Sequence, residues 1–273
     1  MIYCVGVLET AQDQIMTTTP PDPEQAQMSL GEHLEELRRR LIYALLGLGV
    51  AMAVTLVFTP RMVAWLKGPY LRVMEDFRLP ALLATTTVGG GFDIYLRVAF
   101  YAGLILSAPW VFYQLWLFVA AGLLPRERRY VLRAVPLAAL LFVGGAVFCV
   151  LTVAVPTLKF FIWVNHELFG LHMVITLDDY IQFLTTLMLA FGLCFQTPLA
   201  ISLLVRVGLV SLETLRRVRK HVAVVILVIA AVLTPPDVFS QVALGIPMYL
   251  LYELGLLLGR LGTRKRLEEA EAG

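Results

Sequence analysis

Residues 98–124 read VAFYAGLILSAPWVFYQLWLFVAAGLL, an apolar stretch without a single Asp, Glu, Lys or Arg. A helix of about 20 such residues crosses the hydrocarbon core of a bilayer. Each span in lipid must also satisfy its own backbone hydrogen bonds. Five further charge-poor stretches cover residues 41–58, 134–158, 180–205, 222–233 and 238–258. The sequence therefore predicts an all-α, polytopic integral membrane protein with six transmembrane helices, the last two short.

The overall composition points to the same class. Hydrophobic residues make up 59% of the chain and charged residues 15%, with a mean hydropathy of +0.79, whereas soluble domains carry about 25% charged residues. Basic residues lie at the ends of the apolar stretches and form no extended stripe, which argues against nucleic-acid binding. Cys4, Cys149 and Cys194 are far apart and predict neither a disulfide framework nor a metal site. No cofactor is expected.

The end of the apolar region has two interpretations. Residues 222–233 would reach only about 18 Å as a helix, short of the roughly 30 Å hydrocarbon core. Residues 222–258 could instead form one long span, but Thr234-Pro235-Pro236-Asp237 would then lie near mid-bilayer. Two prolines remove backbone donors there and the aspartate adds a charge. Two short spans joined by a tight turn are favoured.

Orientation follows from the positive-inside rule. With six spans, one side holds both termini and most of the 22 Lys and Arg residues; the other side holds Arg61, Lys67, Arg72, Arg78, Arg97 and Lys159. We expect the basic side, and so both termini, to face the cytoplasm. Residues 59–97 form a long outward connection that we expect to be a partly helical periplasmic cap.

Three regions are expected along the chain. Residues 1–28 are polar and proline-containing and are predicted to be a disordered tail, with either Met1 or Met28 as the true start. Residues 29–259 form the six-span membrane domain, and residues 260–273 a charged tail.

A helix start precedes the first span. Residues 29–32, SLGE, have the form of a capping box, and leucines recur at helical spacing from 30 to 41, as in an amphipathic interfacial helix. His33, Glu36 and Arg40 share another face. The i,i+4 pairs Glu35–Arg39 and Glu36–Arg40 have the favourable polarity. On this pattern alone, Glu36 belongs to an exposed pair worth about 0.2–0.5 kcal/mol.

Five segments carry a more specific signal. They are HLEELRRRL at 33–41, LSAP at 106–109 with YQLWLF at 113–118, GLLPRERR at 122–129, FGLCFQTP at 191–198, and LTPPDVFSQ at 233–241 with IPMY at 246–249 and YELG at 252–255. In this order, they resemble the TatC family, the polytopic receptor subunit of the twin-arginine protein translocase. The likeness runs from about residue 30 to residue 259.

The resemblance implies a receptor and not an enzyme. Family members bind the twin-arginine signal peptide of folded cargo at the cytoplasmic face of the cell inner membrane, together with a TatB-type single-span subunit. They then recruit TatA-type single-span subunits into a multimeric complex, and the proton-motive force drives transport. By motif position, Glu36 and Glu127 would receive the two arginines, and Arg38, Phe118 and Pro69 fall at positions that the family also uses.

The chemistry of the two glutamates fits this role. Adjacent arginines of an extended peptide need separate carboxylates, each able to accept a bidentate guanidinium contact. The alternative for Glu127 is pairing with its own neighbours Arg126, Arg128 and Arg129.

Three other polar residues are candidates. Gln196 stands mid-span where relatives commonly carry an acid; an amide cannot take up and release a proton, so we expect polar packing there. Ala121 stands where relatives often have proline, which affects the bend before Glu127. Asp237 is either a polar group on the outward side or the cap of the last helix. Glu253 is an intramembrane acid near the cytoplasmic face, for which the sequence names no partner.

Other functional classes are less well supported. A proton- or ion-coupled small-molecule transporter is the principal alternative. Such a transporter requires ionisable groups near mid-span, and the first four spans have almost none. An intramembrane protease needs a serine–histidine pair or paired aspartates within spans, and Asp178-Asp179 lies at a loop. No nucleotide-binding or hydrolase motif is present.

Overall fold

The computed structural model describes residues 30–81, 83–121, 125–171, 174–233 and 238–271. The predicted N-terminal tail, both candidate start methionines and Asp237 lie outside this part of the chain. Within it, the chain is helical almost throughout, and the β contact is a single bridge between Ala84 and Thr176. The helices are α2 (Leu30–Asp76), α3 (Gly90–Ala121), α4 (Pro125–Phe148), α5 (Val155–Trp163), α6 (Leu177–Cys194), α7 (Thr197–Val207), α8 (Leu212–Arg217), α9 (Arg219–Leu233) and α10 (Val238–Glu271), with π-helical segments η2 (Cys149–Ala154) and η3 (Val164–Leu168) on either side of α5.

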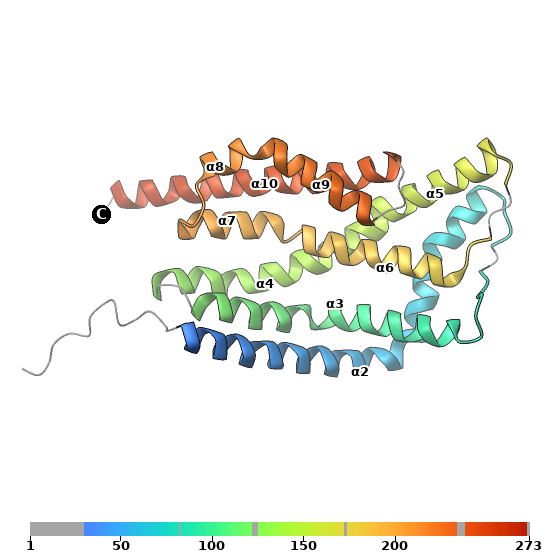
Figure 1. Cartoon of the computed structure of the whole chain (residues 1–273), viewed down its shortest axis with the longest axis horizontal. Helices are drawn as coiled ribbons and strands as arrows, with labels where there is room; N and C mark the ends of the chain where they lie inside the picture. The colour runs from blue at the N-terminus through green and yellow to red at the C-terminus, as the bar shows by residue number, and fades with distance from the viewer. Residues whose placement is uncertain (1–29, 82, 122–124, 172–173, 234–237, 272–273) are drawn as a thin grey trace, which may run out of the picture.

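The membrane-spanning prediction is confirmed. Five helical segments of the described chain are long and apolar enough to cross a bilayer: Gly31–Asp76, Gly90–Ala121, Leu132–Leu168, Leu177–Val207 and Gln241–Leu261. The remaining predicted span, the fifth along the chain at residues 222–233, corresponds to α9, which has only 15 residues. Helix α9 packs along the first part of α10 (Figure 1), so this region forms two separate helices and not one long span.

Helix α2 extends well past the first apolar stretch. It continues without interruption to Asp76, with Pro60 and Pro69 inside it. A proline removes one intrahelical bond and its ring clashes with the preceding turn, so it kinks a helix. Figure 1 shows the later part of α2 turned away from the first part. The outward cap predicted for residues 59–97 is therefore built largely from the continuation of this helix.

The turned part of α2 packs on helices from later in the chain. Leu66, Tyr70 and Val73 are buried in one apolar cluster with residues of α6, including Ile181. The Tyr180 hydroxyl donates to the carbonyl of Leu66 at 2.7 Å, and its ring lies 5.4 Å from that of Tyr70. Burial of these side chains fixes the cap on the bundle.

Prolines also interrupt the third and fourth spans. Pro156 cannot donate to the carbonyl one turn earlier, and the π-helical segment η2 lies directly before it. Pro198 likewise lacks a backbone donor within the predicted span 180–205. This span is divided into α6 and α7, with Phe195 and Gln196 between them. The fourth span is thus two helices in line and not one.

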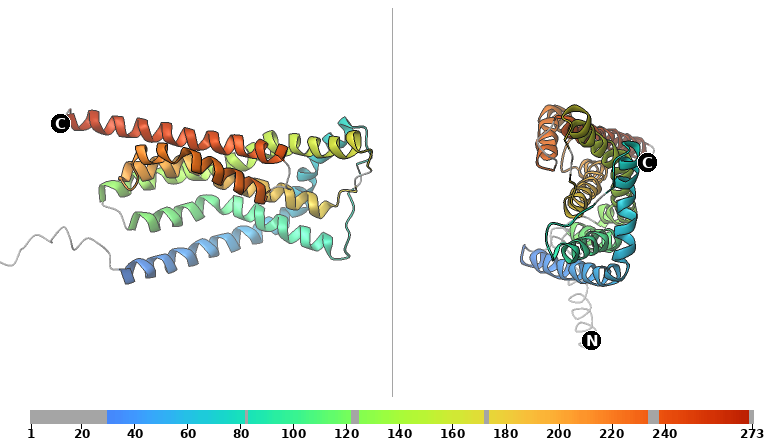
Figure 2. Two further views of the ribbon diagram at one scale, coloured as in Figure 1. Left: turned by 45° about the horizontal axis from the view of Figure 1, so that its top comes forward. Right: turned by 90° about the vertical axis from the view of Figure 1, so that its right-hand side faces the viewer.

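The bundle has two distinct ends. The start of α2, the end of α3, the start of α4, α8 and the C-terminal end of α10 all lie at the end drawn on the left of Figure 1 and of the left view of Figure 2. We call this the basic end. It is the end that the charge distribution predicts to face the cytoplasm.

Candidate functional site

Glu36 lies on the first part of α2 at the basic end. Its side chain is only 11% exposed. The Arg40 Nε donates to its Oε1 at 2.7 Å, and the Arg39 guanidinium donates to its Oε2. One carboxylate thus accepts hydrogen bonds from two guanidinium groups. The predicted i,i+4 pair of Glu36 with Arg40 is confirmed. It is not an exposed pair, however, because the Glu36 side chain is 11% exposed and that of Arg40 21%.

The predicted pairing of Glu35 with Arg39 is also wrong. Arg39 turns to Glu36, and Glu35 instead lies 3.8 Å from Arg38, with both side chains about three-quarters exposed. Arg39 pairs with Glu36, three residues earlier, because an ion pair with this shielded carboxylate is stronger than one with the exposed carboxylate of Glu35. Arg38 therefore lies at the surface and does not contact Glu36.

Gln114 on α3 contacts Arg40 and, through Arg40, is linked to the Glu36 carboxylate. The Arg40 Nη1 donates to Gln114 Oε1 at 3.2 Å, and Gln114 is buried with 3% exposure. This contact joins α2 to α3 across a sequence separation of 74 residues. Sequence reasoning missed Gln114; the available signal was a lone amide in a stretch without charges.

Phe118 lies one turn beyond Gln114 on the same helix. Its ring is half-buried and lies 4.5 Å from the ring of His33, at an interplanar angle of 30°. His33 precedes Glu36 by three residues and so shares its face of α2. His33 and Arg40 both contact α3, so the face of α2 that helical spacing predicted for His33, Glu36 and Arg40 meets α3, and Phe118 lies on that contact.

Glu127 occupies the first turn of α4, and its side chain lies outside the described set. Helix α3 ends at Ala121 and α4 begins at Pro125, so the backbone of Glu127 follows closely on the end of α3 that carries Phe118. Figure 1 shows this corner at the same end of the bundle as the start of α2. The fold thus brings both glutamates to one end of the molecule.

Pro69 does not join this group. It lies in the turned part of α2, toward the opposite end of the bundle, and its side chain is half-buried. The fold therefore places Pro69 in the cap, where it alters the course of α2, and not beside Glu36. Its part in signal-peptide binding stays a prediction.

The two described intramembrane polar residues each have a partner. Gln196 lies between α6 and α7, and its Nε2 donates to the carbonyl of Ala138 on α4 at 3.0 Å. Glu253 on α10 accepts from Arg219 at 2.8 Å and from the Tyr249 hydroxyl at 3.1 Å. Arg219 therefore holds α9 to α10. Among the described residues, no group of three or more His, Cys, Asp or Glu side chains could hold a metal ion.

Comparisons with known proteins agree with this architecture. Residues 32–247 match the family model described as "Sec-independent protein translocase protein (TatC)". The chain is 32% identical to a Sec-independent protein translocase protein TatC of Desulforapulum autotrophicum over 91% of each chain. It is 36% identical to one of Listeria innocua over 89% of this chain and 95% of that one.

A solved structure shows the same fold. A crystal structure described as "Twin Arginine Translocase Receptor- TatC" superposes with a TM-score of 0.76 at 30% identity, covering 85% of this chain and 99% of that chain. The resemblance carried by the five motifs is confirmed, and with it a role in protein transport. The chain belongs to the TatC family and is a subunit of the Sec-independent protein translocase.

Proposed function

We propose that this chain is the receptor subunit of a twin-arginine translocase, binding the signal peptide of folded proteins at its basic end. The observation that carries the proposal is the shielded Glu36 carboxylate, which already accepts two guanidinium groups of its own chain. Charge-assisted bonds of this kind are strong, and partial burial strengthens them further. A peptide arginine brings the same chemical group to the same atoms.

The geometry suggests which contact the peptide replaces. Arg39 is 56% exposed, whereas Arg40 is 21% exposed and bonded to Gln114. A signal-peptide arginine reaching Glu36 from the surface displaces Arg39 and leaves Arg40 in place to orient the carboxylate. The second arginine binds Glu127, and the Phe118 ring offers an apolar face to the peptide beside them.

The proposal includes the membrane arrangement and the partners of the family. The basic end faces the cytoplasm of a cell whose inner membrane holds the protein, so both termini are cytoplasmic. TatB-type and TatA-type single-span subunits join it in a multimeric complex, and the proton-motive force drives transport. Orientation is tested by a cysteine substituted for Gly31 in a chain whose Cys4, Cys149 and Cys194 are replaced by alanine. A membrane-impermeant maleimide is expected to label it in inside-out vesicles but not in intact cells. Labelling only from the outside contradicts the assignment.

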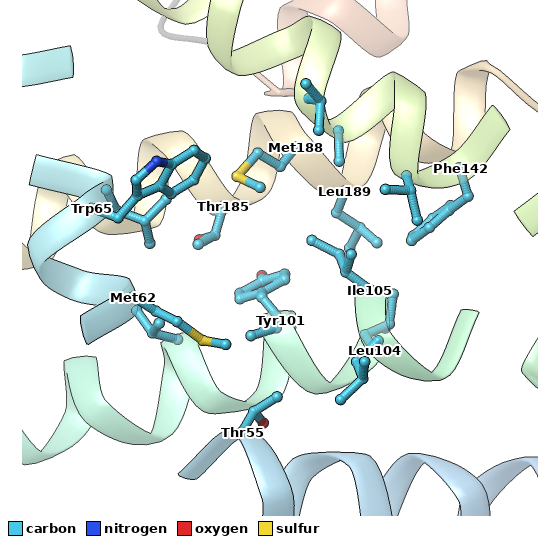
Figure 3. Close-up of a pocket in the computed structure, with 17 residues that line it drawn as sticks. Thr55, Met62, Trp65, Tyr101, Leu104, Ile105, Phe142, Thr185, Met188 and Leu189 are labelled. Carbon is cyan, nitrogen blue, oxygen red and sulfur yellow. The ribbon is translucent and has the colours of Figure 1, made fainter. Parts of the chain in front are cut away.

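An ion-coupled transporter finds little support in the cavity within the bundle. This cavity has a volume of about 380 Å³ and lies between α2, α3, α4 and α6 (Figure 3). None of the described residues that line it is charged. The Thr55 hydroxyl is bonded to the carbonyl of Ala99 and the Thr185 hydroxyl to that of Ile181, each at 2.7 Å. Cation sites need about six oxygen ligands, and among the described lining residues Thr55, Thr185 and Tyr101 bring only three hydroxyl groups.

Photo-crosslinking tests the receptor role. Inside-out vesicles containing the full chain are incubated with a synthetic twin-arginine signal peptide that carries a photoreactive group. Glu36→Gln and Glu127→Gln are each expected to reduce crosslinking at least about tenfold, since a hydrogen bond between charged groups contributes about 1.5–3 kcal/mol. Glu35→Gln is the matched control, because Glu35 is 74% exposed and paired with Arg38.

The controls separate binding from assembly. The amount of each variant in the membrane and its thermal unfolding in detergent show whether it is folded. If Glu36→Gln and Glu127→Gln accumulate normally and crosslink as well as Glu35→Gln does, the assignment of these residues to the receptor site is wrong.

A further inference from the structure

A second polar cleft lies at the basic end, away from Glu36. It has a volume of about 450 Å³ and lies between α10 and the region where α8 passes into α9. These helices lie side by side in Figure 1. Its polar lining consists of Arg216, Arg219 and Arg260 together with Glu253. Three guanidinium groups thus face one carboxylate.

The charge in this cleft is not balanced within the described chain. Glu253 is paired with Arg219 at 2.8 Å. Arg216 and Arg260 are exposed, and neither forms an ion pair with a described acidic side chain. The Arg219 Nε is shielded from solvent and has no hydrogen-bond partner in the described part of the chain. A buried donor without a partner costs free energy, so the site favours an added acceptor.

The same cleft continues into an apolar surface. Leu250, Leu254 and Leu257 line it from α10, where their spacing places them on one face, and all three are exposed. Leu250 also lines an adjoining apolar groove of about 310 Å³ between α9 and α10, and Gly245 is part of the lining of this groove. The charged cleft and the apolar groove therefore adjoin at Leu250 along α9 and α10.

We propose that this cleft binds an anionic phospholipid. The phosphodiester accepts hydrogen bonds from Arg216, Arg260 and the Arg219 Nε, and an acyl chain lies along the leucines of α10 into the groove beside Gly245. The depth is appropriate, because Arg219 directly precedes the apolar run of α9 and so lies at the level of lipid headgroups. Basic pockets between transmembrane helices are suited to anionic headgroups. The bound lipid bridges α9 and α10.

Removal of charge inside and outside the cleft tests the headgroup contact. Native mass spectrometry of the full chain in detergent measures the binding of added phosphatidylglycerol. Arg216→Gln/Arg260→Gln spares the Arg219–Glu253 pair and is expected to weaken binding at least about tenfold. The control is Arg217→Gln/Lys220→Gln, which removes the same charge from exposed residues outside the cleft. It is expected to change binding less than about twofold.

Two further arms distinguish a lipid from other ligands. Phosphatidylcholine is expected to bind the wild-type chain at least about tenfold more weakly, because it carries no net charge, and soluble glycerol phosphate is not expected to compete. Gly245→Leu places a side chain in the groove, where a Cβ would lie 3.4 Å from Leu227, and is expected to weaken phosphatidylglycerol binding with the charges intact. The proposal is wrong if the two double variants bind phosphatidylglycerol equally. It is also wrong if glycerol phosphate competes, or if Gly245→Leu binds phosphatidylglycerol as well as the wild-type chain does.

Discussion

Replacement of Arg39 by glutamine is expected to strengthen the binding of a twin-arginine signal peptide. In the unliganded chain, the Arg39 guanidinium donates to Glu36 Oε2 from the exposed side of the carboxylate. A peptide arginine that takes this position must first break that contact. Without Arg39, Glu36 keeps its bond to Arg40 and offers Oε2 at no such cost.

The size of the effect follows from the exposure of the pair. Arg39 is 56% exposed, so its contact with Glu36 is screened by water and salt. Such pairs contribute about 0.2–1 kcal/mol, which corresponds to a decrease in Kd of roughly 1.4- to 5-fold. Arg40→Gln has the opposite expected effect, because Arg40 joins Glu36 to the buried Gln114 and positions the carboxylate.

Fluorescence anisotropy of a labelled twin-arginine peptide, titrated with the full chain in detergent, measures these changes. Arg217→Gln is the matched control, since Arg217 is 80% exposed, lies at the same end of the bundle and pairs with its own helix neighbour Glu213. It corrects for the loss of one positive charge. If Arg39→Gln binds the peptide no better than Arg217→Gln does, the peptide does not displace Arg39 and the exchange of partners is refuted.

Three other substitutions test the packing that supports the site. Gly103→Ala places a Cβ 2.9 Å from the Met52 backbone and is expected to lower the thermal unfolding temperature in detergent. Gly49→Ala is the control, because its Cβ meets nothing within 4 Å. Equal unfolding temperatures for the two variants contradict the close α2–α3 contact. Tyr180→Phe loses a 2.7 Å hydrogen bond between α6 and the cap and is expected to cost about 1 kcal/mol of unfolding free energy, so an unchanged denaturation midpoint argues against that bond. Gln196→Glu is expected to accumulate normally in membranes, because a neutral acid can donate to the same carbonyl; severe loss of assembled protein counts against this.

Local patterns in the sequence predicted the features that depend on local chemistry. Apolar stretches of sufficient length gave the spans, and helical spacing placed His33, Glu36 and Arg40 on one face, where the structure has them against α3. The prolines of Thr234-Pro235-Pro236-Asp237 favoured two short final spans, and α9 and α10 are separate, mutually packed helices. Each of these features depends only on residues that are close together in the sequence.

Contacts between distant residues could not be predicted in this way. Gln114 meets Arg40, and Glu253 meets Arg219 across 34 residues, because the helices that carry them are brought together by packing. The i,i+4 rule also chose the wrong partner for Arg39, since it ignores the burial of Glu36 by α3. Pro69 was grouped with the binding residues by motif, yet the bend of α2 carries it toward the other end of the bundle.

A double-mutant cycle between receptor and peptide tests the central claim most directly. Affinities are measured for the wild-type chain and Glu36→Gln, each with the twin-arginine peptide and with peptides in which one arginine at a time is replaced by glutamine. The account predicts a coupling free energy of about 1 kcal/mol or more between Glu36 and one of the two arginines, and none when Glu35→Gln is used instead. A coupling for Glu36 no larger than that for Glu35, with both arginines, would show that this carboxylate does not hold the signal peptide.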